Sequence, residues 1–182
     1  MVEGRLAKLR LFFALWPDPE LRKCIASDVE SALRSADRSS INPVEPENYH
    51  ITLAFLGSVS ASSLDDIVRV CSDVHFGRFS LELDRTGYWP RARIVWLGPS
   101  RYSLELEALV DDLWNKLTGL GFRQEPQPYQ PHVSLCRKAG SGLGMSLDSP
   151  INWPVASFVL VQSTPGEDGP VYTVLEQFAA GN

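Results

Sequence analysis

Apolar residues along the first third of the chain predict a strand, a helix and a second strand. Residues 9–16 (LRLFFALW) form a compact apolar run closed by Pro17, which is typical of a buried strand. Asp18 as N-cap and Pro19 at the first helical position predict a helix that continues to about Ala36. After a loop over 42–48, the β-rich residues Tyr49 to Leu56 (YHITLAFL) predict a strand that Gly57 ends.

The same order recurs in the second half of the chain. A short apolar strand is expected over 93–97, and a helix over 100–120 with leucines on its buried side. A proline-punctuated loop over 125–131 then leads into a β-rich segment, His132 to Arg137 (HVSLCR). Strand, helix, loop and histidine-bearing strand therefore occur twice.

The remaining segments give weaker signals. A short helix is expected over 62–74, a strand over 79–88, a loop rich in Gly and Ser over 138–150, and closing strands over 155–162 and 171–178. Together with the duplication, they predict an α+β fold. We expect two pseudo-symmetric lobes, each a mostly antiparallel sheet backed by helices, with a cleft between them and one domain spanning residues 1–182.

Composition limits the function classes. A net charge of −5 disfavours a protein that coats nucleic acid non-specifically, because such binding needs many basic residues. The three cysteines are widely spaced and form no CxxC pair, which fits a reducing cytoplasm. No run approaches the roughly 20 apolar residues that cross a bilayer, and residues 11–16 are too few for a signal-peptide core.

Two of the three histidines carry the strongest chemical signal. His50 and His132 each open a predicted strand, stand 82 residues apart, and have a hydroxyl residue two positions later, Thr52 and Ser134. Side chains two apart in a strand share a face, so each pair projects together, roughly 7 Å apart. A pseudo-twofold axis between the lobes would bring both pairs into one cleft. His75 lacks the hydroxyl partner and is expected at a helix end or in a loop.

This constellation suits the opening of a cyclic phosphate. One imidazole can take a proton from water while the other protonates the departing oxygen, and two hydroxyls can donate to the phosphoryl oxygens. A structural role for an isolated His-x-Thr is the ordinary alternative, and the duplication weighs against it. Neither HExxH, nor GxSxG, nor GxxxxGK[ST] is present, and the two histidine strands hold no carboxylate, so no metal or cofactor is expected.

The segments HITLAFLG, from His50 to Gly57, and HVSL, from His132 to Leu135, resemble the 2H phosphoesterase superfamily. Within it they resemble the bacterial RNA 2′,3′-cyclic phosphodiesterase (2′-5′ RNA ligase-like) branch. Residues 9–14 (LRLFFA) and 91–98 (RARIVWLG) extend the resemblance over nearly the whole chain. It implies metal-independent hydrolysis of an RNA-terminal 2′,3′-cyclic phosphate to a 2′-phosphate, reversible as 2′-5′ ligation. It further implies His50 as the proton donor and His132 as the proton acceptor, roles that the residues alone leave open.

The resemblance also implies a phosphate contact for Arg137. Strict alternation places Arg137 on the opposite face from His132, so such a contact requires a bulge at the strand's end. Arg91 and Arg93 share a face by period and are candidates for steering the RNA backbone, with a plain surface pair as the alternative. Tyr49, Tyr129 and Trp89 flank the motifs and are candidates for base stacking, with core packing as the alternative use.

The sequence thus predicts a cytoplasmic, monomeric hydrolase acting on RNA that ends in a 2′,3′-cyclic phosphate, such as tRNA fragments. Two alternatives stay open. One is an RNA-end or nucleotide binding module with little turnover. The other is the same chemistry on a small nucleotide, such as a cyclic phosphate of ADP-ribose, which the net charge of −5 also allows.

Overall fold

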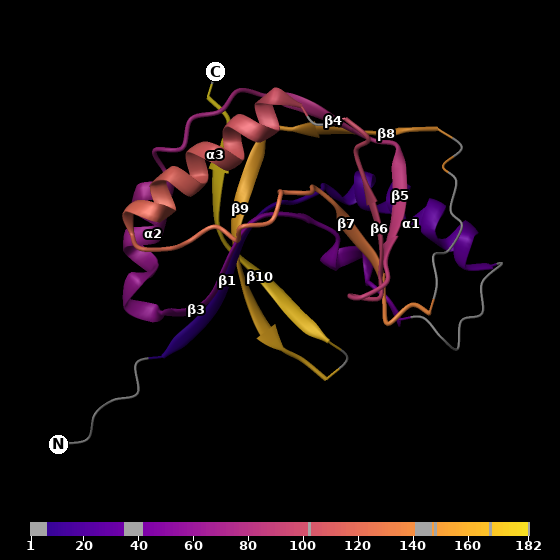
Figure 1. Ribbon diagram of the computed structural model, residues 1–182, viewed down its shortest axis with the longest axis horizontal. Coiled ribbons are helices and arrows are strands. Elements are labelled where there is room, and N and C mark those ends of the chain that lie inside the picture. The colour runs from indigo at the N-terminus through magenta and orange to yellow at the C-terminus, as the bar shows by residue number, and fades with distance from the viewer. Residues whose placement is uncertain are drawn as a thin grey trace.

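A computed structural model describes residues 7–34, 42–101, 103–140, 147, 149–167 and 169–181, with side chains up to residue 30 in the first of these ranges. Eight strands form one sheet in the order β10-β9-β1-β3-β7-β6-β5, with β2 paired to β7, and two further strands, β4 and β8, form a separate ribbon (Figure 1). Every strand pair is antiparallel. The α+β class predicted from the sequence is therefore confirmed.

The elements follow the predicted duplicated order. The first half contains β1 (Lys8–Leu15), α1 (Pro19–Arg34), β2 (Asn42–Pro43), a 3-10 turn η2 (Pro46–Asn48), β3 (Ile51–Ser60), a second turn η3 (Ala61–Ser63), α2 (Leu64–Cys71) and β4 (Phe79–Leu83). The second half contains β5 (Arg85–Trp89), β6 (Ile94–Gly98), α3 (Leu104–Gly119), β7 (Val133–Arg137), β8 (Ile151–Val155), β9 (Ser157–Pro165) and β10 (Pro170–Ala179). The predicted helix end near Ala36, and most of the predicted loop over 138–150, lie outside the described residues.

Local sequence signals start the helices. The carboxylate of Asp18 accepts a hydrogen bond from the backbone N–H of Leu21 at 2.8 Å, and the Ser103 hydroxyl accepts one from Leu106 at 3.0 Å. Each cap satisfies a backbone donor that the first helical turn leaves free. The helices α2 and α3 pack against each other, and α3 also contacts β3 (Figure 1).

The two halves of the sheet repeat the same pairing with one constant offset. In β1 and β3 the partners are Phe13 with Ala54, Ala14 with Thr52, and Leu15 with Ile51. In β6 and β7 they are Val95 with Cys136, Trp96 with Ser134, and Leu97 with Val133. Each residue of the second set stands 82 positions after its counterpart, which is also the spacing of His50 and His132. The pseudo-twofold axis therefore passes between β3 and β7, where Ile51 pairs with Val133.

Both histidine strands contain a bulge at the equivalent place. The register skips Leu53 between the pairs of β1 and β3, and skips Leu135 between the pairs of β6 and β7. Consequently Leu53 and Ala54 are both buried, as are Leu135 and Cys136. A bulge adds one residue to its strand and so reverses the alternation beyond it. This reversal decides which face the end of each strand presents.

One face of the sheet carries the core and the other is open. Leu11, Phe13 and Leu15 of β1 are fully buried in the main core, together with the apolar side of α3. Phe12 and Ala14 lie on the opposite face, where they pack with Val159 and Val161 of β9 in a smaller cluster. The open face is the one on which His50 lies, because the His50 ring is 5.0 Å from that of Phe12.

Two predictions of element bounds are wrong, and one strand was not predicted. Gly57 does not end its strand: β3 continues to Ser60, and Gly57, at φ +69°, takes the left-handed conformation beside a further bulge at Leu56. The strand expected over 79–88 is divided at Asp84, whose carboxylate accepts hydrogen bonds from the backbone and hydroxyl of Ser100 at 2.6 Å each. The sequence also gave no signal for β8, whose Pro154 is tolerated because the ribbon has only two strands.

Candidate active site

The two histidines are brought together by the pairing at the centre of the sheet. His50 immediately precedes β3 and His132 immediately precedes β7, and Ile51 faces Val133 across the antiparallel pair. Extending this register by one residue in each direction sets His50 opposite Ser134 and Thr52 opposite His132. Cross-strand partners share a face, so all four side chains project on the side opposite the buried Ile51 and Val133.

The backbone holds both imidazoles in the same way. Nδ1 of His50 lies 2.6 Å from the carbonyl oxygen of Asn48, and Nδ1 of His132 lies 2.8 Å from that of Gln130. Because a carbonyl only accepts, each Nδ1 carries a proton and donates it. Each Nε2 is therefore the nitrogen that is left for proton exchange with a ligand.

Burial and nearby positive charges lower the pKa of both imidazoles. Burial is the main cause that lowers the pKa of His50, to about 4, and the charges of His132 and Arg137 lower it further. Burial also lowers the pKa of His132, and Arg137 contributes again. The hydrogen bonds to Asn48 and Gln130 act in the opposite direction but are outweighed. Both rings are therefore neutral at pH 7, and each has an Nε2 that can accept a proton.

Aromatic side chains enclose His50. Its ring stacks on Trp16 with a centroid separation of 5.5 Å and an interplanar angle of 18°, and it meets the edge of Tyr172 at 5.3 Å. With Phe12, these rings form an apolar surround that explains the lowered pKa. Sequence reasoning missed all three residues. The period-two alternation along β1 could have shown that Phe12 and Trp16 share a face. Tyr172 gave no such signal, because it lies in a strand more than 120 positions after His50.

His132 faces a broad groove. Its ring meets that of Trp89 edge to face, with centroids 4.4 Å apart. The groove has a volume of about 750 Å³, and its walls include Thr52, Phe55, Trp89, Arg91 and Tyr129. The Tyr129 hydroxyl donates to the carbonyl of Thr52 at 3.1 Å, which ties the loop before β7 to β3. Of the three aromatics singled out from the sequence, Trp89 and Tyr129 line this groove, whereas Tyr49 is buried in the core.

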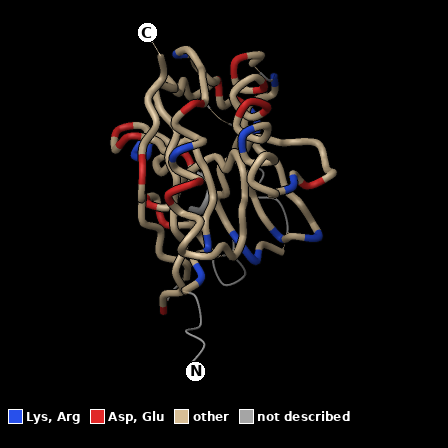
Figure 2. Tube along the Cα trace, turned by 90° about the vertical axis from the view of Figure 1, so that its left-hand side faces the viewer, with Lys and Arg blue, Asp and Glu red and all other residues tan. Residues whose placement is uncertain are grey.

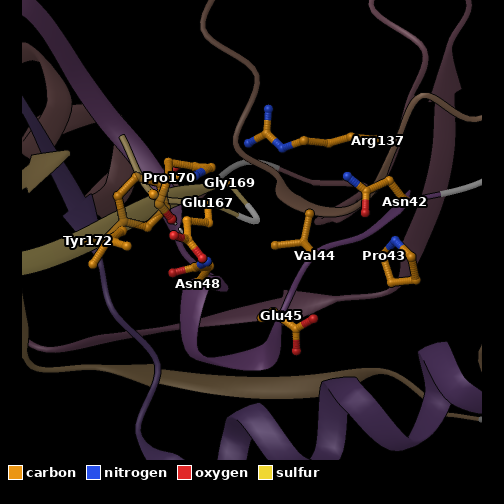
Figure 3. Close-up of a pocket in the computed structure, with 12 residues that line it drawn as sticks. Asn42, Pro43, Val44, Glu45, Asn48, Arg137, Glu167, Gly169, Pro170 and Tyr172 are labelled. Carbon is orange, nitrogen blue, oxygen red and sulfur yellow. Dashed lines mark hydrogen bonds between the residues drawn. The ribbon is translucent and has the colours of Figure 1, made fainter. Parts of the chain in front are cut away.

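The bulge in β7 returns Arg137 to the face of the sheet on which the histidines lie. Leu135 and Cys136 both turn into the core, so Arg137 returns to the face of Ser134 and influences both imidazoles. The structure thus contains the bulge that a phosphate contact by Arg137 requires. Arg137 also lines a second groove of about 570 Å³, between residues 42–48 and the β9–β10 hairpin, in which Tyr172 and Asn48 lie across from it (Figure 3).

The two arginines of the β5–β6 connection do not share a face. Residues 90–93 form a turn rather than part of a strand, so the alternation assumed for Arg91 and Arg93 is wrong. Arg93, at φ 55°, donates through Nη2 to the carbonyl of Lys138 at 2.7 Å and through Nε to that of Ala139 at 3.2 Å. Arg93 therefore fastens the chain after β7, whereas Arg91 lines the broad groove.

The described part of the chain offers neither a metal-binding cluster nor a membrane-spanning helix. Residues 7–34, 42–101, 103–140 and the described segments beyond contain no group of three or more His, Cys, Asp or Glu side chains arranged to hold a metal ion. No helix within these same residues is long and apolar enough to span a membrane.

A duplicated sheet that sets two His-x-Thr/Ser sequences side by side is the arrangement expected of a 2H phosphoesterase. Residues 15–96 match the family model for LigT-like phosphoesterases. An RNA 2′,3′-cyclic phosphodiesterase of Aeropyrum pernix is 34% identical over 151 residues, which are 76% of this chain and 86% of the relative. The chain belongs to the LigT-like phosphoesterase family, as the resemblance of the sequence predicted.

Further relatives extend the match over both motifs. An Escherichia coli RNA 2′,3′-cyclic phosphodiesterase is 32% identical over 172 residues, covering 93% of this chain and 96% of the relative. The crystal structure of E. coli LigT complexed with 3′-AMP superposes with a TM-score of 0.84 at 28% identity, covering 97% of this chain and all of that one.

Proposed function

We propose that this protein is an enzyme that hydrolyses the 2′,3′-cyclic phosphate at the end of an RNA to a 2′-phosphate. The observation that carries the proposal is the pairing of Ile51 with Val133, which sets two backbone-anchored imidazoles and two hydroxyls on one open face. The family's curated relatives bearing the name RNA 2′,3′-cyclic phosphodiesterase support the same reaction.

The reaction needs one proton removed and one delivered. Nε2 of neutral His132 takes a proton from a water molecule while the oxygen of that water attacks phosphorus. The bond between phosphorus and the 3′-oxygen breaks, and Nε2–H of protonated His50 delivers a proton to that oxygen, leaving a 3′-hydroxyl and a 2′-phosphate. Atoms and charge balance with water as the only other reactant, and the proposed mechanism is metal-independent because it assigns every proton transfer to a histidine.

Three side chains are proposed to hold the phosphoryl oxygens. Thr52 and Ser134 lie on the same face as the histidines and can donate through their hydroxyls. Arg137 adds a guanidinium whose charge already influences both imidazoles. Donors preorganised around the developing charge stabilise the transition state more than the ground state.

The assignment of His50 as the acid carries one condition. Since its pKa is lowered to about 4 by burial, His50 must gain its proton together with the anionic substrate. A phosphate anion beside the imidazole raises the pKa, because the opposite charge favours the protonated ring. The apolar surround of Trp16, Phe12 and Tyr172 strengthens that attraction by excluding water.

The test uses a short RNA ending in a 2′,3′-cyclic phosphate, incubated with protein and EDTA. His50→Ala and His132→Ala should each lower the rate at least about 100-fold, as loss of an acid or base does. His75→Ala is the matched control, because this exposed histidine lies after α2 and should leave the rate unchanged. Phosphorus NMR should identify a 2′-phosphate product. Measurable affinity without product would support the binding module instead, and loss of activity in EDTA would refute the metal-independent mechanism.

The finer assignments are part of the same proposal. We propose one bilobal domain over residues 1–182 that acts as a monomer in the cytoplasm, with tRNA fragments among its substrates. Size-exclusion chromatography with light scattering tests the monomer, and comparison of tRNA-derived with unstructured RNA ends tests the substrate.

A further inference from the structure

Each histidine has an indole neighbour, but the two indoles come from positions that the duplication does not relate. The offset of 82 residues relates Trp16, which stacks on His50, to Gly98. The indole beside His132 is instead that of Trp89 in β5, with ring centroids 4.4 Å apart. The pseudo-twofold symmetry is therefore broken here, and the second indole is supplied by a different strand.

Gly98 leaves no room for a side chain. A Cβ atom at this position would lie 2.6 Å from the carbonyl oxygen of Pro131 and 3.6 Å from Cα of His132. The backbone that leads into β7 thus runs directly against Gly98, and an indole there would displace the histidine. An aromatic neighbour for His132 has to come from elsewhere in the sheet.

Trp89 is supported from behind by Trp96. Their ring centroids are 5.4 Å apart, and their planes are inclined by 35°. Trp96 pairs with Gly87 across β5 and β6, and Trp89 follows Gly87 by two positions, so both indoles lie on one face. A side chain at Gly87 would overlap the indole of Trp96, which rests on the glycine backbone. Trp96 is buried and has no space to move away from Trp89 toward β5.

The imidazole of His132 needs a second contact besides its hydrogen bond. The bond from Nδ1 to the carbonyl oxygen of Gln130 fixes one atom and leaves the ring able to swing about it. Trp89 meets this ring at 78°, an edge-to-face contact that aromatic pairs favour, and so limits the swing. The direction of Nε2 matters because a displacement of about 1 Å in a catalytic group can cost about 100-fold in rate.

The groove wall that contains Trp89 also belongs to a basic border of the molecule. Lys and Arg gather along the lower edge of the molecule in Figure 2, whereas most Asp and Glu lie above it. In Figure 1 the β5–β6 turn, which contains Arg91, lies at this same edge. A residue that binds RNA at such a border changes the affinity, in a way that depends on salt. A residue that acts through His132 changes the rate of the bound complex instead.

We propose that Trp89 is a positioning residue for the general base, holding the His132 imidazole so that Nε2 faces the attacking water. Gly87 and Trp96 in turn hold Trp89 against that ring. The inference rests on the proposed function, in which His132 is the base. It adds that Trp89 acts through this histidine and not through a contact of its own with the RNA.

The kinetic test replaces the indole and measures kcat and KM separately. Trp89→Leu should lower kcat at least about tenfold at every salt concentration, while KM changes less than about twofold. Trp89→Phe keeps an aromatic ring at this half-buried position and should recover most of the rate. Trp153→Leu is the matched control and should leave kcat unchanged, because this buried tryptophan lies in the separate β4–β8 ribbon.

Proton NMR tests the contact without turnover. Trp89→Leu should move the Hε1 resonance of His132 and raise its pKa, because burial is what lowers that pKa, and should leave His50 unchanged. The acidic limb of the pH–rate profile should move to higher pH by the same amount. Gly87→Ala should shift His132 in the same way, because the added methyl group displaces Trp96.

The possible failures are distinguishable. Absence of turnover by the wild-type protein would refute the proposed function, and with it the role of Trp89 in the reaction. Turnover by Trp89→Leu with an unchanged kcat and a raised KM would refute the positioning role alone and make Trp89 a ligand-binding residue. Equal effects of Trp89→Leu and Trp153→Leu on His132 would likewise refute it.

Discussion

Ile51 of β3 and Val133 of β7 face each other in the antiparallel pairing that joins the two halves of the sheet, and both side chains are fully buried. Each is the residue between a histidine and its hydroxyl partner. A slip of one residue in this pairing would exchange the two faces and turn the histidines toward the core. Burial of these two side chains therefore holds the register on which the site depends.

Truncation at this pair should cost much of the stability. Ile51→Ala is expected to lower the free energy of unfolding by about 2–5 kcal/mol, because it leaves a cavity at a site that is 0% exposed. Urea denaturation measures the change. Val174→Ala on the exposed side of β10 is the control and should change stability by less than about 0.5 kcal/mol. Equal effects of the two substitutions would contradict the role of the pair.

The lowered pKa of His50 predicts an acid-sensitive fold. In the unfolded chain the imidazole takes up its proton near pH 6.5, and in the folded protein only near pH 4. Between these values the unfolded state binds more protons, so stability falls as the pH falls, by no more than about 3 kcal/mol from this group. His50→Asn should lose less stability than the wild type between pH 6.5 and 4 in urea titrations. Parallel curves for the two proteins would refute the shift.

Binding of an anion at the centre should take up protons. Sulfate serves as the probe because it does not itself titrate near pH 7. It should raise the pKa of His50 and His132 and so draw up to about one proton from the buffer. Calorimetry in buffers of different ionisation enthalpy measures this uptake. His50→Asn should reduce this uptake. If the wild-type protein bound sulfate without taking up protons, His50 would not be protonated with the anion and could not act as the acid.

Removal of the charge of Arg137 should shift both imidazoles in the same direction. Arg137 lowers the pKa of His50 and of His132, so Arg137→Gln should raise both. Proton NMR of the imidazole Hε1 resonances during a pH titration reports the two values separately. Arg78→Gln, at an exposed site before β4, is the control. An effect on one ring alone would contradict an influence of Arg137 on both imidazoles.

The two arginines of the β5–β6 turn should have different roles, Arg93 in stability and Arg91 in RNA binding. Arg93→Ala is expected to lower the free energy of unfolding by about 1–2 kcal/mol, because it removes hydrogen bonds to the carbonyls of Lys138 and Ala139. Arg91→Ala should leave stability nearly unchanged and instead weaken RNA binding at low salt. Thermal denaturation and fluorescence anisotropy distinguish the two, and a reversal of these effects would refute the assignment.

Local pattern was enough for most of the elements, though not for β8, and for the choice of His50 and His132. The alternation of strand side chains put each histidine on a face with its hydroxyl, Thr52 or Ser134, and the repetition of the pattern singled out two histidines of three. Such signals can be read because they depend on residues two to four positions apart. Arg137 was named only through the resemblance, because strict alternation placed it opposite His132 unless the strand contained a bulge.

Other features depended on contacts between segments far apart in the chain. Gly57 looked like a strand end because glycine is favoured both in turns and at bulges, and only the pairing with β1 distinguishes the two. From the sequence, Arg93 was expected to share a face with Arg91. Its hydrogen bonds to the carbonyls of Lys138 and Ala139, which show a different role, depend on the fold. Tyr172 reaches His50 because β10, β9 and β1 are adjacent in the sheet.

The sequence by itself determined the duplicated order of elements, the two histidines with their hydroxyls, and the family. All of these can be recognised from the periodicity of neighbouring residues and from short motifs. The tertiary structure alone decided the pairing of Ile51 with Val133, the equivalent bulges and the aromatic surround of His50. These follow from register and burial, which are set by the packing of the whole chain and not by any one segment of it.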